Sequence, residues 1–310
     1  FGRYPVPVID VVRILFHHIF GLPGELATEQ TMVIAVTNVR LPRILLACMV
    51  GCSLSAAGCA YQSVFQNPMA SPDILGASSG ACFGAALAIL LHRQSVMITV
   101  FAFCFSLISL VFVYLVGNRI HGRKTVSLLL AGVMIGSLFS SGTSYLKLVA
   151  DPANELPAIT YWLMGSLSGT RMHQVIMAFP VMATGVVVLL LLRWRINLLS
   201  VDESEARSMG VNIDKLRMVI ILAATLLTAA AVSFSGIIGW VGLVVPNLCR
   251  RLTGADNRYL LPASMLTGAA FLLIVDDVAR NLLAVEIPIG ILTAFIGAPF
   301  FLYLMTRKER

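Results

Sequence analysis

From about residue 44 to its end, the chain alternates long apolar stretches with short polar ones. A helix needs roughly 20 apolar residues to cross a hydrocarbon core about 30 Å thick. We expect a transmembrane helix in each of nine windows: Ile44–Phe65, Ile74–Leu91, Val96–Val116, Val126–Val149, Val175–Leu192, Leu216–Phe234, Ile237–Leu252, Leu260–Leu283 and Ile289–Met305. The pattern predicts an all-α, polytopic membrane protein with a single transmembrane domain over residues 1–310.

The basic residues predict an orientation. Fourteen of the 22 Lys and Arg residues fall in one set of alternate loops and eight in the other. Because cytoplasmic loops carry the excess of Lys and Arg, the first set and the C-terminus are expected in the cytoplasm. The mixed stretch 1–37 is then external. The chain begins at Phe1 rather than Met, so we expect a tenth helix upstream if the natural N-terminus is cytoplasmic.

Composition supports a bilayer as the surrounding medium. The chain is 58% hydrophobic and 12% charged, with a mean hydropathy of +0.89, which excludes an ordinary soluble domain. The net charge is +7, but the basic residues lie at the ends of the apolar windows rather than in one stripe, so we expect no nucleic-acid partner.

The sequence contains no nucleotide-binding loop, metal-ligand motif or nucleophile elbow. We therefore expect no enzymatic activity, no resident cofactor and no metal site. The six cysteines lie mostly beside Gly, Ala and Ser and are interpreted as packing residues. Cys48, Cys52 and Cys59 could share one helical face, which leaves a metal relay as the alternative.

Asp276, Asp277 and Arg280 are the charged residues nearest to an apolar interior. Their spacing places either acid within one helical turn of the arginine, so a structural ion pair is the favoured interpretation. The alternative is a proton-coupled secondary transporter that uses Asp276 or Asp277 as its carrier.

Several segments depart from simple crossings. Gly76, Gly80 and Gly84 recur at the spacing of close helix packing, and Gly236, Gly239, Gly242 and Pro246 interrupt a crossing, which indicates packing or a broken helix beside a path. Ile159–Leu167 is too short to span and is expected to be re-entrant or interfacial. Residues 197–215 form a polar connector, with a short amphipathic helix that ends at Gly210.

The block RLPR…QNPM…GASSG, from Arg40 onward, resembles the signature of the permeases of ABC importers for iron-siderophores, haem and cobalamin. LLSVDESEARSMGV (198–211), SGIIGWVGLVVPNLCRRLTGADNRYLLPAS (235–264) and VEIPIGILTAFIGAPFFLYL (285–304) resemble the remaining family blocks, in the same order. One departure is Asn247 after Pro246, where the family often has Pro-His; Asn cannot titrate or take a metal as His does.

The resemblance implies ten helices per subunit and a homodimer around one path. It also implies two cytoplasmic ATPase subunits that bind ATP and Mg²⁺, and an external substrate-binding protein. The location would be the cytoplasmic membrane of a bacterium or archaeon. The cargo would be a ferric siderophore, haem or cobalamin, or, as in some relatives, molybdate or tungstate.

The resemblance also implies residue roles. The docking arginines for the binding protein would be Arg40, Arg43 and Arg280. A cytoplasmic gate would be formed by Asn67, Pro68 and Met69, facing Thr125, Val126 and Ser127. The coupling helix that seats in each ATPase would comprise Glu203, Glu205, Ala206, Arg207, Met209 and Gly210.

Overall fold

The computed structural model describes residues 6–20, 30–120, 124–200 and 211–306, and within these ranges it is helical with no strand. The α-helices are α1 (Val8–Phe20), α2 (Gln30–Ile34), α3 (Leu41–Val64), α4 (Ala77–Leu90), α5 (Ser95–Gly117), α6 (Lys124–Val149), α7 (Glu155–Leu163), α8 (Met172–Ile196), α10 (Ile213–Ser235), α11 (Val241–Thr253), α12 (Asn257–Asn281) and α13 (Ile289–Thr306). Shorter turns are the π-helical η1 (Ala35–Arg40) and the 3₁₀ turns η2 (Pro72–Leu75) and η3 (Asn197–Ser200).

Six described helices are long and apolar enough to cross a membrane: Gln30–Val64, Ser95–Gly117, Thr125–Val149, Met172–Leu199, Ile213–Ser235 and Asn257–Asn281. Ala77–Leu90 and Ile289–Tyr303 are shorter apolar helices. The six long helices correspond to six of the nine predicted windows, and the two shorter helices lie in two further windows. The prediction of a polytopic all-α protein is therefore confirmed.

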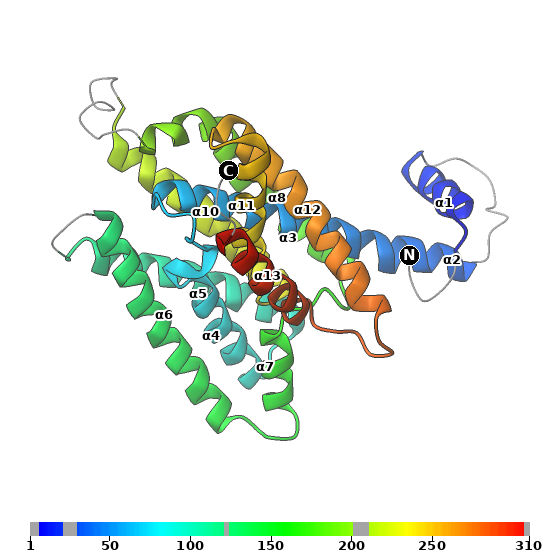
Figure 1. Ribbon diagram of the computed structural model, residues 1–310. Helices are drawn as coiled ribbons and strands as arrows, with labels where there is room; N and C mark the ends of the chain where they lie inside the picture. The colour runs from blue at the N-terminus through cyan, green and yellow to red at the C-terminus, as the bar shows by residue number, and fades with distance from the viewer. Residues whose placement is uncertain (1–5, 21–29, 121–123, 201–210, 307–310) are drawn as a thin grey trace.

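Helix α3 lies at the centre of the molecule and contacts α8, α10, α11 and α12 (Figure 1). A Cβ on Gly51 would lie 2.2 Å from the carbonyl oxygen of Gly268 in α12, and one on Gly58 would lie 1.8 Å from that of Gly242 in α11. Glycine allows backbones to approach this closely, because any side chain would separate them. The core is therefore built on backbone-to-backbone packing around α3.

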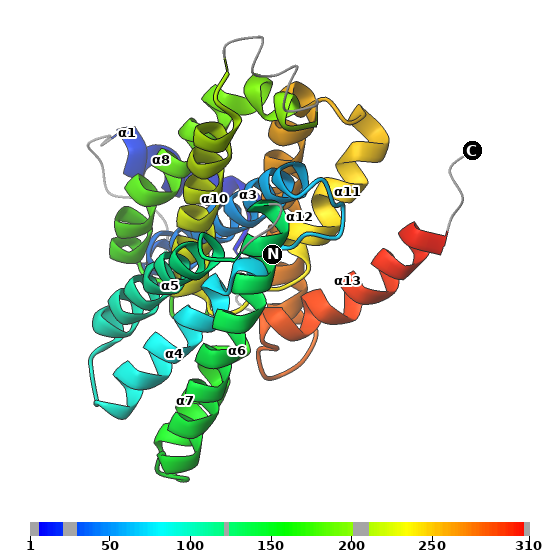
Figure 2. The same ribbon diagram turned by 90° about the vertical axis from the view of Figure 1, so that its left-hand side faces the viewer.

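Helices α4 to α7 form a second group, which contacts the first through α10 (Figure 1). Gly80 and Gly84 let α4 approach α5, since a Cβ on either would lie 2.6 or 2.4 Å from the carbonyl oxygen of Phe105 or Phe101. The packing interpretation of these glycines is confirmed. Helix α13 contacts α11 and α12 and projects away from the other helices (Figure 2).

The predicted start of the first crossing at Ile44 is wrong. A continuous helical stretch runs over Gln30–Val64 and includes the π-helical turn Ala35–Arg40. The predicted window began only after Arg40 and Arg43, because a hydropathy scale counts each arginine as a charge placed in lipid. In the fold, Arg43 lies inside the helix bundle beside carboxylates, so its charge is compensated by protein rather than by water.

The prediction that Ile237–Leu252 is one continuous transmembrane helix is also wrong. Helix α11 has 13 residues, about 20 Å of length, which is too short for a 30 Å core. Gly236 and Trp240 have φ angles of +69° and +70°, so the chain does not continue helically from α10 into α11. The helix is therefore broken at Gly236, as one alternative expected, whereas Gly242 packs closely against α3. That the break lies beside a path stays a prediction.

Candidate functional site

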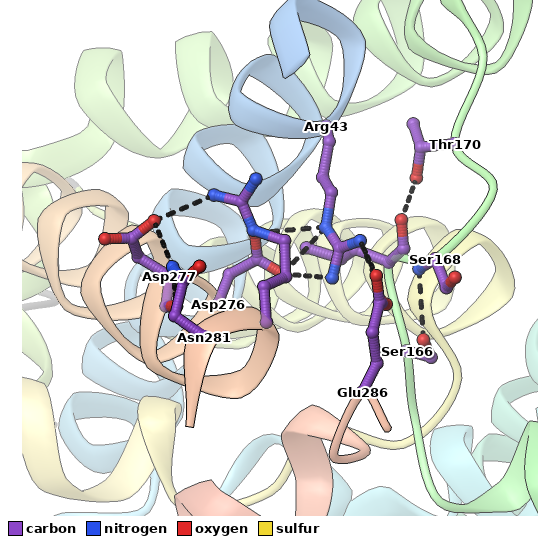
Figure 3. A network of polar contacts seen from close by, with 10 residues as sticks. Arg43, Ser166, Ser168, Thr170, Asp276, Asp277, Asn281 and Glu286 are labelled. Atoms are coloured by element: carbon purple, nitrogen blue, oxygen red, sulfur yellow. Dashed lines mark hydrogen bonds and ion pairs between the residues drawn. The ribbon is translucent and has the colours of Figure 1, made fainter. Parts of the chain in front are cut away.

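A buried ion network joins the beginning of α3 to the end of α12 (Figure 3). Arg43 donates through Nε to both carboxylate oxygens of Asp276, at 3.0 and 3.1 Å, and through Nη1 to Glu286, at 3.1 and 3.0 Å. Arg280 lies 3.3 Å from Asp276 and 3.0 Å from Asp277. The network therefore unites α3, α12 and the loop before α13.

Because the central residues of this network are buried, the loss of any one charge would destabilise the fold. Asp276 is fully buried and the Arg43 side chain is 7% exposed. A charge removed from water is costly unless a partner and hydrogen bonds replace the hydration, and loss of one partner from such a pair destabilises by about 3–5 kcal/mol. The ion pair predicted within α12 is confirmed, whereas Arg43 and Glu286 were not expected to join it.

The three arginines assigned to docking differ in accessibility. Arg43 is buried, the Arg280 side chain is 13% exposed and Arg40 is half-buried. None of the three arginine side chains is fully exposed. Glu286, the outermost partner of Arg43, has a side chain that is 32% exposed. Docking stays a prediction for these residues.

At the other end of α3 lies the QNPM turn, residues 66–69, in which a hydrogen bond runs from the Ala70 N–H to the Asn67 carbonyl at 3.0 Å. The Asn67 side chain also accepts from the Met69 N–H, at 2.8 Å. Asn in the first position and Pro in the second are the residues that such a turn favours. Met69 is 56% exposed at its tip.

Helix α11 holds this turn through Asn247. The side-chain amide of Asn247 donates to the Pro68 carbonyl at 2.8 Å, and its oxygen accepts from Arg250 at 2.9 Å. Arg250 also donates to Gln62 in α3, at 2.8 Å. Asn247 and Gln62 are 8% and 3% exposed. The residue that departs from the family pattern is therefore a structural contact of the turn.

A second polar cluster fixes η3, the connector that precedes residues 201–210. Asn197 donates to Asp256 at 2.7 Å and accepts from the backbone and side chain of Asn257, at 2.9 and 2.8 Å. Ser63 of α3 donates to Asn257 at 3.2 Å. Hydrogen bonds from the Arg258 backbone N–H and from Asn197 lower the pKa of Asp256. These hydrogen bonds therefore favour the ionised carboxylate, the form that accepts from Asn197 and Arg258.

The remaining predicted site residues are placed as follows. Thr125, Val126 and Ser127 lie in the first turn of α6, with Val126 exposed and Ser127 buried and bonded to the Ile120 carbonyl at 3.3 Å. Their role as the opposing wall of a gate stays a prediction. Glu203, Glu205, Ala206, Arg207, Met209 and Gly210 lie outside the described residues.

An apolar groove of about 690 Å³ lies between α7, the segment before α11, and α13. Its lining carries no charged side chain and includes Met164, Ile237, Trp240, Ile291 and Phe295. Phe295 is 76% exposed.

Helix α7 has nine residues, so the prediction that the segment Ile159–Leu167 is too short to span the membrane is confirmed.

The comparison with known proteins covers the whole fold. The model of the FecCD transport family matches residues 1–307. The cobalamin import system permease protein BtuC of Halobacterium salinarum is 43% identical over 99% of this chain and 81% of its own length. The molybdate import system permease protein MolB of Haemophilus influenzae is 40% identical over 100% of this chain and 90% of its own.

A solved structure assigned to the metal-chelate type of ABC transporter, in an inward-facing conformation, superposes with a TM-score of 0.85 at 40% sequence identity. The superposition covers 96% of this chain and 95% of the other. The sequence comparison and the fold comparison therefore agree, and the chain belongs to the FecCD transport family.

Proposed function

We propose that two copies of this chain form the membrane passage of a binding-protein-dependent ABC importer, with two ATPase subunits on the cytoplasmic side and a substrate-binding protein outside. The cargo is a metal chelate, namely a ferric siderophore, haem or cobalamin, or a metal oxyanion, namely molybdate or tungstate. The observation that carries the proposal is the match of one transport family to residues 1–307. Access alternates between the two sides as helices rock.

The chemistry of the cycle belongs to the partner subunits in this proposal. They bind ATP and Mg²⁺, while this chain holds no cofactor and responds mechanically. The segment Glu203–Gly210 is the handle that each ATPase moves. Support comes from its flank, because Asn197 bonds η3 to the first residues of α12, and a displacement of the handle would therefore reach the helix bundle.

Orientation follows from charge and length. Fourteen of 22 basic residues lie in the loops assigned to the cytoplasm, on the side of the C-terminus and the QNPM turn. Arg43 and Gln62 are 19 residues apart in one helix, about 29 Å, close to the thickness of the hydrocarbon core. The ion network then lies at the outer end and the QNPM turn at the cytoplasmic end.

At the outer end, we assign Arg40, Arg43 and Arg280 to docking of the binding protein. An acidic side chain from that protein would compete with the partly exposed Glu286 for Arg43. Exposed ion pairs contribute only about 0.2–1 kcal/mol each, and the buried Arg43 already has Asp276 and Glu286 as partners. These contacts would therefore set the orientation and encounter rate of the binding protein more than its affinity.

The apolar groove beside α13 is the surface that we assign to the second copy and the shared passage. It is uncharged, and α13 projects from the bundle (Figure 2). A passage without fixed charges binds its cargo weakly, which leaves selection to the external protein.

A proton-coupled mechanism is disfavoured by the partners of Asp276. A carrier carboxylate must release and take up a proton in each cycle, whereas Asp276 is buried between Arg43 and Arg280. A carrier role would require Asp276 to give up its ion pairs with Arg43 and Arg280 in every cycle, which would leave the two buried arginines without that partner.

Cargo class is tested by isothermal calorimetry of the cognate binding protein with ferric siderophores, haem, cobalamin, molybdate and tungstate. We expect tight binding of one class, either the organic chelates or the oxyanions. Binding of none of them, with the protein folded, would contradict the proposed cargo.

A further inference from the structure

The QNPM turn is held from two sides by side chains that belong to different parts of the fold. On one side, Asn247 of α11 donates to the Pro68 carbonyl. On the other side, Gln66 of the turn itself donates to the Leu199 carbonyl in η3. These bonds connect the turn to α11 and to the connector that leads to residues 201–210.

The chemistry of its partners fixes the orientation of the Asn247 amide. A carbonyl only accepts, so the Asn247 nitrogen faces Pro68 and Leu243. A guanidinium only donates, so the Asn247 oxygen faces Arg250. All three contacts are met by one side chain in one orientation, and no other assignment of nitrogen and oxygen satisfies them.

The backbone of Gln66 has a conformation that is rare for residues other than glycine. Its φ angle is +48°, in the left-handed region, which is disfavoured for a residue with a Cβ. The bond to Leu199 and the backbone bond from Asn67 to Gln62, at 3.1 Å, maintain this conformation. The backbone bond closes the C-terminus of α3, and the side-chain bond connects the same residue to η3.

The connector is in turn fixed to the bundle. Asn197 bonds to Asp256 and Asn257, and Ser63 of α3 bonds to Asn257. Leu198 and Leu199 are 9% and 4% exposed and belong to the main core. A shift of η3 would therefore be passed to the Leu199 carbonyl as a displacement rather than absorbed by a loose loop.

We infer that Gln66 and Asn247 are positioning residues that link the QNPM turn to η3 and to α11, so that movement of η3 opens or closes this end of the passage. The inference rests on the proposed function and deepens it. Gln66 transmits the movement of η3 to the turn. Asn247 holds the turn against α11 until that movement displaces the turn.

Asn247→Asp separates the bond that the amide accepts from the two bonds that it donates. The carboxylate keeps the acceptor for Arg250 and the size of the side chain, but it loses the donor to Pro68 in the turn and to Leu243 within α11. Asn118→Asp is the matched control, because Asn118 is exposed at the end of α5 and undergoes the same chemical change. Gln66→Ala removes the bond to Leu199, with the exposed Gln94→Ala as its control.

Two readouts test the inference on the assembled transporter in lipid nanodiscs and proteoliposomes. Hydrogen exchange of the peptide covering residues 66–70 should accelerate roughly fivefold to tenfold in Asn247→Asp and Gln66→Ala, as expected for one lost hydrogen bond. Exchange in α4 and α8 should stay unchanged. Cargo moved per ATP hydrolysed should fall at least threefold in both variants and in neither control.

Unchanged exchange at residues 66–70, or accelerated exchange with an unchanged transport-to-hydrolysis ratio, would overturn the inference. Failure of the proposed function gives a different result. In that case the unaltered complex would show no ATP-dependent transport, while hydrogen exchange would still report whether the two side chains hold the turn.

Discussion

At the residue scale, the fold is governed by how each buried charge is compensated. Asp276 and Arg280 are four residues apart, so their pairing is evident from helical spacing. Arg43 is 233 residues from Asp276 along the chain, and no local pattern connects the two. The sequence therefore predicts half of this network, and only the packing of α3 against α12 supplies the rest.

The two neighbouring aspartates should differ in their effect on stability. Asp276→Asn leaves a fully buried site with two arginines and one fewer anion, and we expect a loss of about 3 kcal/mol. Asp277→Asn should cost under about 1 kcal/mol, because its side chain is 34% exposed. Thermal unfolding of the two purified variants in detergent compares them directly. Equal losses would refute the central place of Asp276.

At the element scale, the apolar windows predicted most helices but not every end. Hydropathy placed the start of α3 too late, because Arg43 is compensated by residues far away in sequence. It also drew α11 as a crossing, because apolar residues before Val241 lie in non-helical conformations that composition does not reveal. Helix existence is a local property, whereas these ends depend on tertiary contacts.

Close packing around α3 predicts a graded response to added methyl groups. Gly58→Ala would place a Cβ 1.8 Å from the Gly242 carbonyl oxygen, so α3 and α11 must separate, at a cost of about 1–3 kcal/mol. Gly239→Ala is the control, since nothing lies within 4 Å of its Cβ. Unfolding midpoints of both variants should differ in this order, and a stable Gly58→Ala protein would contradict the packing account.

At the scale of the whole molecule, the ion network and the QNPM turn occupy opposite ends of α3, and α10 joins the two groups of helices (Figure 1). The family blocks in the sequence contain the RLPR and QNPM segments that lie at the two ends of α3. They did not predict that Asn247, Gln66 and Asn197 connect those segments, because each bond joins residues more than 50 positions apart.

The measurement that tests the central claim most directly is cargo uptake by proteoliposomes that contain this chain with its ATPase, with loaded binding protein added on the side of the ion network. We predict accumulation only when ATP is supplied to the ATPase, and no loss of accumulation when a protonophore collapses the pH gradient. Accumulation driven by an imposed proton gradient without the ATPase would contradict the account and identify a secondary transporter.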